Sequence, residues 1–99
     1  MYRVVFAPEA EAQLVALYFQ LATAASLEIA DSYTEAIVEQ CESLKTFPIR
    51  GTLRDDLRPG LRTFGFRRRV TIAFEATAGT VTILGIFYGG QDFAAAFEE

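Results

Sequence analysis

Arginine side chains are concentrated in one short part of this 99-residue chain. Seven of its nine Lys and Arg residues lie between positions 50 and 69. Because a guanidinium group stays charged and can bind a carboxylate or phosphate through two hydrogen bonds, such a cluster suits an anionic partner. The alternative is a set of solvated arginines at the edge of a strand. The candidate target- or anion-binding residues in this segment are Arg54, Arg58, Arg62, Arg67, Arg68 and Arg69.

The loop in this segment has its own turn residues. Pro59 and Gly60 favour a bend, and we expect Arg58 and Arg62 to project together from it. Arg54 is followed by Asp55 and Asp56, so an internal ion pair that fixes the loop is the alternative to a binding role for this arginine.

The charge is unevenly distributed along the chain. Residues 1–49 carry a net charge of −5, residues 50–69 carry +5 and residues 70–99 carry −4, for a total of −4. General adhesion to nucleic acid or to an anionic membrane needs a dominant positive field. We therefore expect no direct high-affinity DNA binding, and any anionic contact must be local.

The types of residue present limit the possible chemistry. The chain has no His, which removes every Ser-His or Cys-His arrangement and the common zinc sites. Its single cysteine, Cys41, lies on an apolar helix face and is expected to be buried. We therefore predict no catalytic residue, no metal and no cofactor.

The length and composition are those of one small domain, residues 1–99. Hydrophobic residues make up 52% of the chain, enough for a core without disulfides. No apolar run approaches the roughly 18 residues of a membrane span, and the N-terminus lacks the pattern of a signal peptide. We expect a cytoplasmic protein without membrane contact.

The periodicity of the apolar residues predicts two helices and four strands in the order βααβββ. Pro8 is suited to the first turn of one helix, Ser26 to the N-cap of the next, and Phe47-Pro48 to its end. The expected elements are a strand 2–6, a helix 8–22, a helix from 26 to about 46, and strands 61–66, 69–76 and 80–88.

The first helix has a second apolar strip besides the one expected to face the core. Ala12, Val15, Phe19 and Ala22 form this strip, and an apolar face on the outside of a helix marks an interaction site. Self-association through the strip is the alternative. The tail from residue 91 to 99 is expected to form a short helix or to wait for a partner.

The chain resembles the ParE branch of the RelE/ParE superfamily, the toxins of bacterial type II toxin-antitoxin pairs. The resemblance covers nearly the whole length and rests on the order and spacing of four segments. These are Phe6-Ala7-Pro8-Glu9-Ala10, Phe47-Pro48, the segment from Arg54 to Arg62, and Gly85-Ile86-Phe87-Tyr88-Gly89-Gly90-Gln91-Asp92.

The resemblance implies an α+β fold of two layers, in which a helical hairpin packs on a four-stranded antiparallel sheet whose first strand lies beside the last. It also implies a ParD-like antitoxin that wraps the toxin with a helix and an extended segment, as a hetero-oligomer, with a homodimer as another possibility. The candidate antitoxin-binding residues are Val15, Phe19, Ala22, Phe93 and Phe97. Tyr88, Gln91 and Asp92 lie where RelE-like relatives place functional groups, with capping of a strand end as the alternative.

Two activities follow from the resemblance: poisoning of DNA gyrase, as in ParE-like toxins, and cleavage of messenger RNA on the ribosome, as in RelE-like toxins. RNA cleavage by 2′-hydroxyl attack needs a base beside the phosphate-binding cations. The only lysine, Lys45, lies at the far end of a helix, and Glu75 qualifies only if it points toward the arginines. We therefore favour the non-catalytic gyrase poison. The alternatives are a ribosome-dependent mRNA endonuclease and an inactive interaction module.

Overall fold

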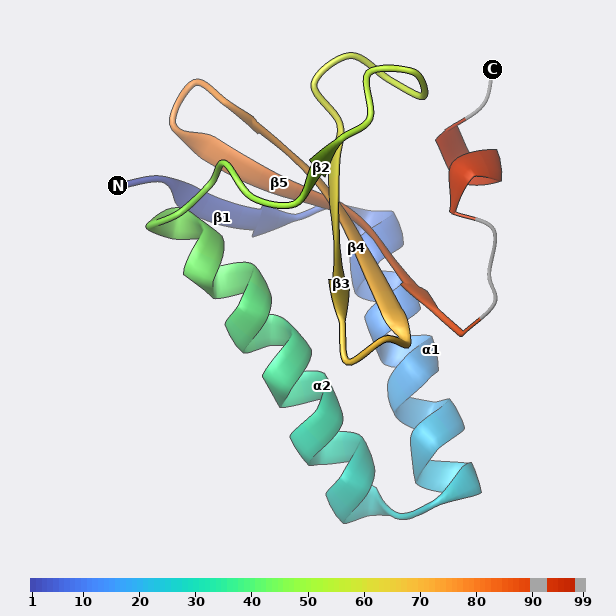
Figure 1. Cartoon of the computed structure of the whole chain (residues 1–99). Helices are drawn as coiled ribbons and strands as arrows, with labels where there is room; N and C mark the ends of the chain where they lie inside the picture. The colour runs from blue at the N-terminus through green and yellow to red at the C-terminus, as the bar shows by residue number, and fades with distance from the viewer. Residues whose placement is uncertain (90–92, 98–99) are drawn as a thin grey trace.

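The computed structural model describes residues 1–89 and 93–97 (Figure 1). The elements are β1 (Arg3–Phe6), α1 (Pro8–Ala24), α2 (Leu27–Glu42), a 3-10 turn η1 (Ser43–Lys45), β2 (Thr52–Leu53), β3 (Arg62–Phe66), β4 (Val70–Thr77), β5 (Thr80–Tyr88) and a second 3-10 turn η2 (Ala94–Phe97). No helix within these described ranges is long and apolar enough to cross a membrane.

The strands form a five-stranded sheet in the order β1-β5-β4-β3-β2. The expected α+β architecture and the position of the first strand beside the last are confirmed. Two details differ from the expectation. The sheet is mixed, because β1 pairs with β5 in parallel, and it has a fifth strand, the two-residue β2, which pairs with β3. Both residues of β2 are exposed, so no alternation of apolar residues marks this strand in the sequence.

The helices begin and end at local signals. Pro8 occupies the first turn of α1, and the Ser26 side chain caps α2 by accepting a hydrogen bond from the Ile29 backbone N–H at 3.1 Å. The α-helical part of α2 ends at Glu42, earlier than expected, and the chain continues as η1 before Phe47-Pro48. The helix α1 runs two residues beyond the expected Ala22.

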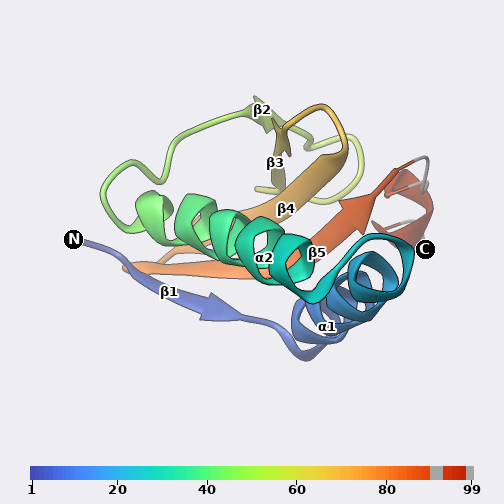
Figure 2. The same cartoon turned by 90° about the horizontal axis from the view of Figure 1, so that it is seen from below.

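Both helices cover one face of the sheet (Figure 2). Ala10 and Leu17 of α1 and Ile37 and Cys41 of α2 are buried in the core between the layers. The sheet contributes alternate residues to the same core: Phe66, Val70, Ile72, Phe74, Val81, Ile83 and Ile86. The side chains between them therefore point to the other face.

The second face of the sheet has a smaller apolar cluster. Leu61, Ala73 and Phe87 are buried there, and Phe93 and Phe97 of the C-terminal segment pack on them. The rings of Phe93 and Phe97 lie 6.1 and 6.2 Å from that of Phe87. The expected tail thus contains a short helical turn, and this turn covers part of the sheet.

Candidate functional site

Two of the six candidate arginines are held in ion pairs on the face of the sheet away from the helices. Arg54 donates from Nε and Nη2 to the two carboxylate oxygens of Asp56, at 2.9 and 2.8 Å, and its guanidinium lies 5.5 Å from the centre of the Phe93 ring. Arg58 donates from Nη2 to Glu75 Oε1 at 2.9 Å. The internal ion pair considered in the sequence as the alternative for Arg54 is present, with Asp56 as the partner. Much of the hydrogen-bonding capacity of Arg54 is therefore used inside the chain.

The loop that carries these arginines is fixed by its own acids. The backbone N–H of Gly60 donates to Asp55 Oδ1 at 2.8 Å. The hydrogen bond from Arg54 holds the pKa of the Asp56 carboxyl below its ordinary value. The bend at Gly60, with a φ of 80°, is therefore closed by side-chain contacts as well as by glycine.

Arg62 lies on the opposite face of the sheet from Arg58. It is half-buried and donates from Nη1 to the Arg50 carbonyl oxygen at 3.3 Å. Arg50 in turn donates to Ser43 Oγ at 2.6 Å and lies 4.9 Å from the centre of the Phe64 ring. Arg58 and Arg62 therefore do not project together. The one-residue alternation along β3 places Arg62 on the helical side and Leu61 on the other.

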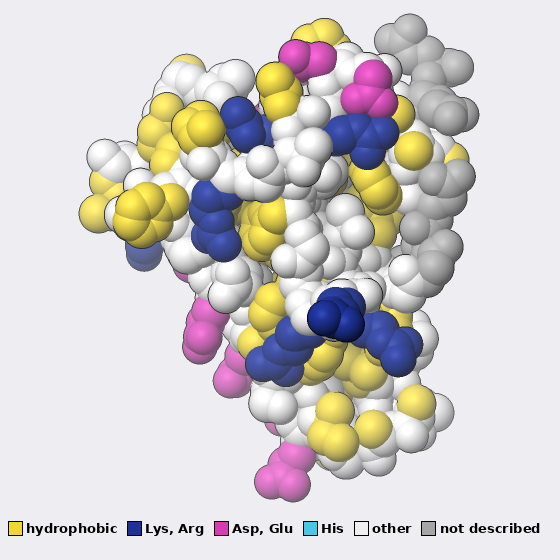
Figure 3. Space-filling view, in the orientation of Figure 1, with side chains coloured by type: hydrophobic (Ala, Val, Ile, Leu, Met, Phe, Trp, Pro, Cys, Tyr) yellow, Lys and Arg dark blue, Asp and Glu magenta, His cyan; other side chains and the backbone are white. Residues whose placement is uncertain are grey.

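Arg67, Arg68 and Arg69 form the tip of the hairpin between β3 and β4, and all three are exposed. We call these three residues the arginine tip. The Arg69 backbone N–H donates to the Phe66 carbonyl oxygen at 3.2 Å, which closes the turn. No salt bridge to the tip forms within residues 1–89 and 93–97. Basic side chains gather around the hairpin end in Figure 3.

Aromatic side chains surround the base of the arginine tip. The Arg67 guanidinium lies 4.9 Å from the Phe66 ring centre and 5.5 Å from that of Tyr33. The rings of Tyr33 and Tyr88 are 6.2 Å apart and nearly perpendicular. The Tyr33 hydroxyl is buried without a hydrogen-bond partner in the described part of the chain, and burial raises its pKa.

The end of β5 lies next to the arginine tip. Tyr88 is opposite Val70 in the sheet, and the Gly89 backbone N–H donates to the Arg69 carbonyl oxygen at 2.7 Å. The end of β5 at Tyr88 thus lies beside the turn that carries Arg67 and Arg69. Gln91 and Asp92, the two other candidates of this group, lie outside the described residues.

Glu75 does not point toward the arginine tip. Its carboxylate is paired with Arg58. It is also five residues along β4 from Val70, which at about 3.4 Å per residue is roughly 17 Å. The carboxylate considered in the sequence as a base for RNA cleavage is therefore separated from Arg67, Arg68 and Arg69.

The second apolar strip of α1 is exposed, as expected. The exposed fraction is 54% for Val15 and 63% for Phe19, while Ala22 is half-buried. The Tyr18 ring packs edge-on against Phe19 at 5.6 Å. Since a monomer gains nothing by exposing these side chains, the strip is suited to a partner.

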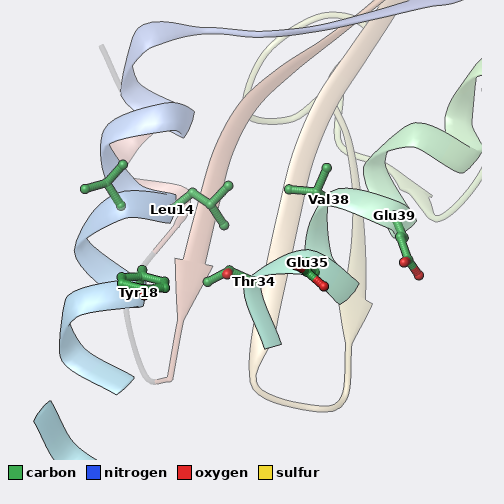
Figure 4. Close-up of a pocket in the computed structure, with 7 residues that line it drawn as sticks. Leu14, Tyr18, Thr34, Glu35, Val38 and Glu39 are labelled. Carbon is green, nitrogen blue, oxygen red and sulfur yellow. The ribbon is translucent and has the colours of Figure 1, made fainter. Parts of the chain in front are cut away.

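A groove lies beside the strip, between α1 and α2 (Figure 4). It has a volume of about 450 Å³ and is lined by Leu14, Val15 and Tyr18 of α1 and by Thr34, Glu35, Val38 and Glu39 of α2. A second hollow of about 530 Å³ shares Leu14, Val15 and Val38 and continues to the β1 residues Val4, Val5 and Phe6. We call the two together the helical groove. The neighbouring Asp31 carboxyl raises the pKa of the Tyr18 hydroxyl.

The other two candidates for antitoxin binding lie elsewhere. Phe93 and Phe97 are half-buried and pack on Phe87, on the sheet face that the helices leave open. The structure therefore does not bring them together with Val15 and Phe19. The end of β5 lies beside α1, where Ile86 and Tyr88 line a hollow with Gln13 and Leu17, whereas Phe93 and Phe97 pack on the other face of the sheet.

One exposed apolar group was not anticipated from the sequence. Phe47, Ile49 and Leu53 are 65%, 69% and 47% exposed and lie between α2 and β3. The sequence signal was the pair Phe47-Pro48, which we interpreted only as the end of a helix. Phe47 is a large aromatic residue that lies outside any amphipathic pattern, and this was the available sign of an exposed apolar group.

Cys41 lies in the hydrophobic core between the helices and the sheet. It is fully buried, and burial raises the pKa of its thiol to about 12, so the thiolate needed for nucleophilic attack does not form near neutral pH. Across residues 1–89 and 93–97, no group of three His, Cys, Asp or Glu side chains is arranged to hold a metal ion.

Comparison with known proteins agrees with this architecture. Residues 4–93 match the family described as ParE toxin of type II toxin-antitoxin system, parDE. Among solved structures, the chain is similar to one from the chromosomal ParDE TA system of P. aeruginosa, with 27% sequence identity and a TM-score of 0.78, covering 90% of this chain and 97% of that one. A search of curated proteins found no match. Since the family match spans nearly the whole sequence, the chain belongs to the ParE toxin family of type II toxin-antitoxin systems.

Proposed function

We propose that this ParE-family chain binds DNA gyrase, leaves cleaved DNA unsealed, and is neutralised by a ParD-like antitoxin. We propose a cytoplasmic location for the chain, where this function would be carried out. We propose that the chain acts on gyrase without the antitoxin. Neutralisation then produces a hetero-oligomer of the chain and the antitoxin.

The observation that carries the proposal is the separation of the arginine tip from the Glu75 carboxylate. Arg67, Arg68 and Arg69 form no salt bridge within the described ranges, and Glu75 is paired with Arg58 some distance away. Cleavage of RNA by 2′-hydroxyl attack requires a base close to the phosphate, whereas a poison needs only to bind. This arrangement favours a binding activity.

The helical groove supports the second part of the proposal. Its walls are apolar, with Leu14, Val15 and Val38 shared by both hollows. Its rim has three carboxylates, those of Glu11, Glu35 and Glu39. An amphipathic segment with apolar residues on one side and Lys or Arg beside them fits this combination. We therefore place the antitoxin here, with Val15, Phe19 and Ala22 on its border.

The test of the target uses the purified chain, gyrase and supercoiled plasmid. We expect linear plasmid to accumulate when the chain is added, and an equimolar antitoxin to prevent it. A reaction without gyrase is the control. In bacteria that express the chain alone, double-strand breaks should appear. Arrest of translation with cleavage of ribosome-bound messenger RNA, and no breaks, would contradict the gyrase proposal.

An RNA endonuclease is the second candidate, and one observation favours it. Tyr88, at a position where RelE-like relatives place functional groups, lies at the strand end beside the turn that carries Arg67 and Arg69. If this candidate is correct, Tyr88→Phe abolishes messenger cleavage while the fold is retained. Normal growth of cells that express the soluble chain would favour the inactive interaction module over both activities.

A further inference from the structure

The arginine tip differs from the other candidate arginines in what surrounds it. Arg54 and Arg58 are neutralised by carboxylates at 2.8 and 2.9 Å, and Arg62 is half-buried against a carbonyl oxygen. The three residues of the tip are exposed, and no salt bridge reaches them within residues 1–89 and 93–97. The charge available to an outside anion is therefore concentrated at the hairpin.

The backbone of the tip is unfavourable for the residues it contains. Arg67 and Arg68 have φ values of 51° and 61°, in the left-handed region that glycine and asparagine adopt with much less strain. A turn with positive φ at both central residues normally contains Asn-Gly or a similar pair. Strained non-glycine residues of this kind are concentrated at functional sites. The two arginines thus occupy positions where their side chains cost stability.

The arrangement of the three charges favours phosphates over carboxylates as the bound groups. Three adjacent cations on one turn need three closely spaced anions, and on a protein surface such anions repel one another. A DNA duplex presents one negative charge per about 1.7 Å of its axis, so neighbouring phosphates meet this requirement. The rings of Phe66 and Tyr33 also hold the Arg67 guanidinium at the surface.

We propose that the arginine tip contacts phosphates of the DNA that gyrase holds. This inference rests on the proposed function, since the chain as a whole has a charge of −4 and is not expected to bind free DNA tightly. Binding to gyrase supplies the proximity, and the tip then adds a contact with the DNA backbone.

The test variant is Arg67→Asn with Arg68→Gly. It removes two charges while placing Asn and Gly at the two positions with positive φ, so the hairpin is expected to fold at least as well. The matched control is Arg3→Gln with Lys45→Gln, which removes two exposed cations outside the tip. Thermal unfolding of all three proteins verifies that they are folded.

The experiment measures the dissociation constant of each protein for gyrase with bound duplex DNA and for gyrase alone, between 50 and 200 mM salt. With three phosphate contacts, each contributing about 0.9 to the logarithmic salt slope, the wild-type affinity for the DNA complex falls about 40-fold over this range. The variant keeps only Arg69, so its affinity falls about 3-fold. The control retains the wild-type slope, and all three proteins bind DNA-free gyrase equally.

Two results would overturn the inference while leaving the gyrase proposal intact. One is a wild-type salt slope in the Arg67→Asn, Arg68→Gly variant. The other is an equal loss of affinity for gyrase with and without DNA, which would assign the tip to carboxylates of the gyrase protein. If the wild-type chain binds neither form of gyrase, the proposed function fails and the inference fails with it.

Discussion

The side chain of Gln13 in α1 accepts the backbone hydrogen bond of Ile86 in β5 that a neighbouring strand would otherwise accept. Gln13 Oε1 accepts a hydrogen bond from the Ile86 backbone N–H at 2.7 Å. The pairing of β1 with β5 ends at Phe6 and Ile83, so beyond this point β5 has no neighbour on that side. The amide oxygen therefore satisfies a buried backbone donor that the sheet leaves open.

We expect Gln13→Leu to lower the free energy of unfolding by about 1–3 kcal/mol, because the buried Ile86 N–H loses its acceptor. Urea denaturation measures the change. Gln20→Leu is the matched control, since Gln20 is exposed on the same helix, and should remain within about 0.5 kcal/mol of wild type. Equal effects of the two substitutions would mean that the Gln13 hydrogen bond contributes nothing specific.

At the arginine tip, we expect Arg68→Gly to raise the free energy of unfolding by about 1 kcal/mol, because glycine adopts a φ of 61° with less strain. Arg69→Gly is the control. Arg69 does not have a positive φ, so glycine there relieves no strain and only increases the conformational entropy of the unfolded chain. We therefore expect Arg69→Gly to lower the free energy of unfolding. A lower melting temperature for Arg68→Gly would show that its side chain contributes packing that outweighs the strain.

On the exposed strip of α1, we expect Phe19→Ala to weaken antitoxin binding at least tenfold, or about 1.4 kcal/mol, if Phe19 packs against the antitoxin. Calorimetric titration measures the affinity. The stability of the free chain should change little, since the Phe19 side chain is 63% exposed. Phe47→Ala removes an equally exposed ring away from the helical groove and is the control. Unchanged antitoxin affinity in Phe19→Ala would move the antitoxin site off this helix.

The Arg54 and Asp56 pair predicts a specific dependence of stability on pH. The pKa of Asp56 is lowered by the hydrogen bond from Arg54, from an ordinary value of 3.8. The unfolded chain therefore binds this proton first as the pH falls, and the stability from the pair is present above pH 3.8 and lost below it. We expect Asp56→Asn to unfold with a shallower acid dependence than wild type, as measured by denaturation between pH 2 and pH 6. Parallel curves for the two proteins would contradict the assignment.

The sequence predicted the helices and the long strands because each has a local signal. Pro8, Ser26 and Phe47-Pro48 mark helix ends, and the residues around Val70, Ile72 and Phe74 alternate clearly. The strand β2 could not be predicted in this way, since Thr52 and Leu53 are both exposed and are ordered only by pairing with β3. The parallel pairing of β1 was also beyond local reasoning, because Arg3 meets Thr80 only through tertiary structure.

The sequence predicted the candidate site as a set of arginines. The structure separates those held in ion pairs from those that are exposed at the hairpin. Arg54 found a partner two residues away, which the sequence suggested, whereas Arg58 found Glu75, which is 17 residues distant. The sequence also did not indicate that Arg67 and Arg68 would occupy left-handed conformations, because arginine has no preference for them. Long-range pairing and backbone strain, both tertiary effects, decide which arginines remain available.

The parallel alignment of Arg3 with Thr80 has a consequence for synthesis of the chain. A nascent chain that has not yet reached Thr80 lacks the strand on which both β1 and β4 pair, so it has no route to the native sheet. The native sheet can therefore form only after this last strand has been translated.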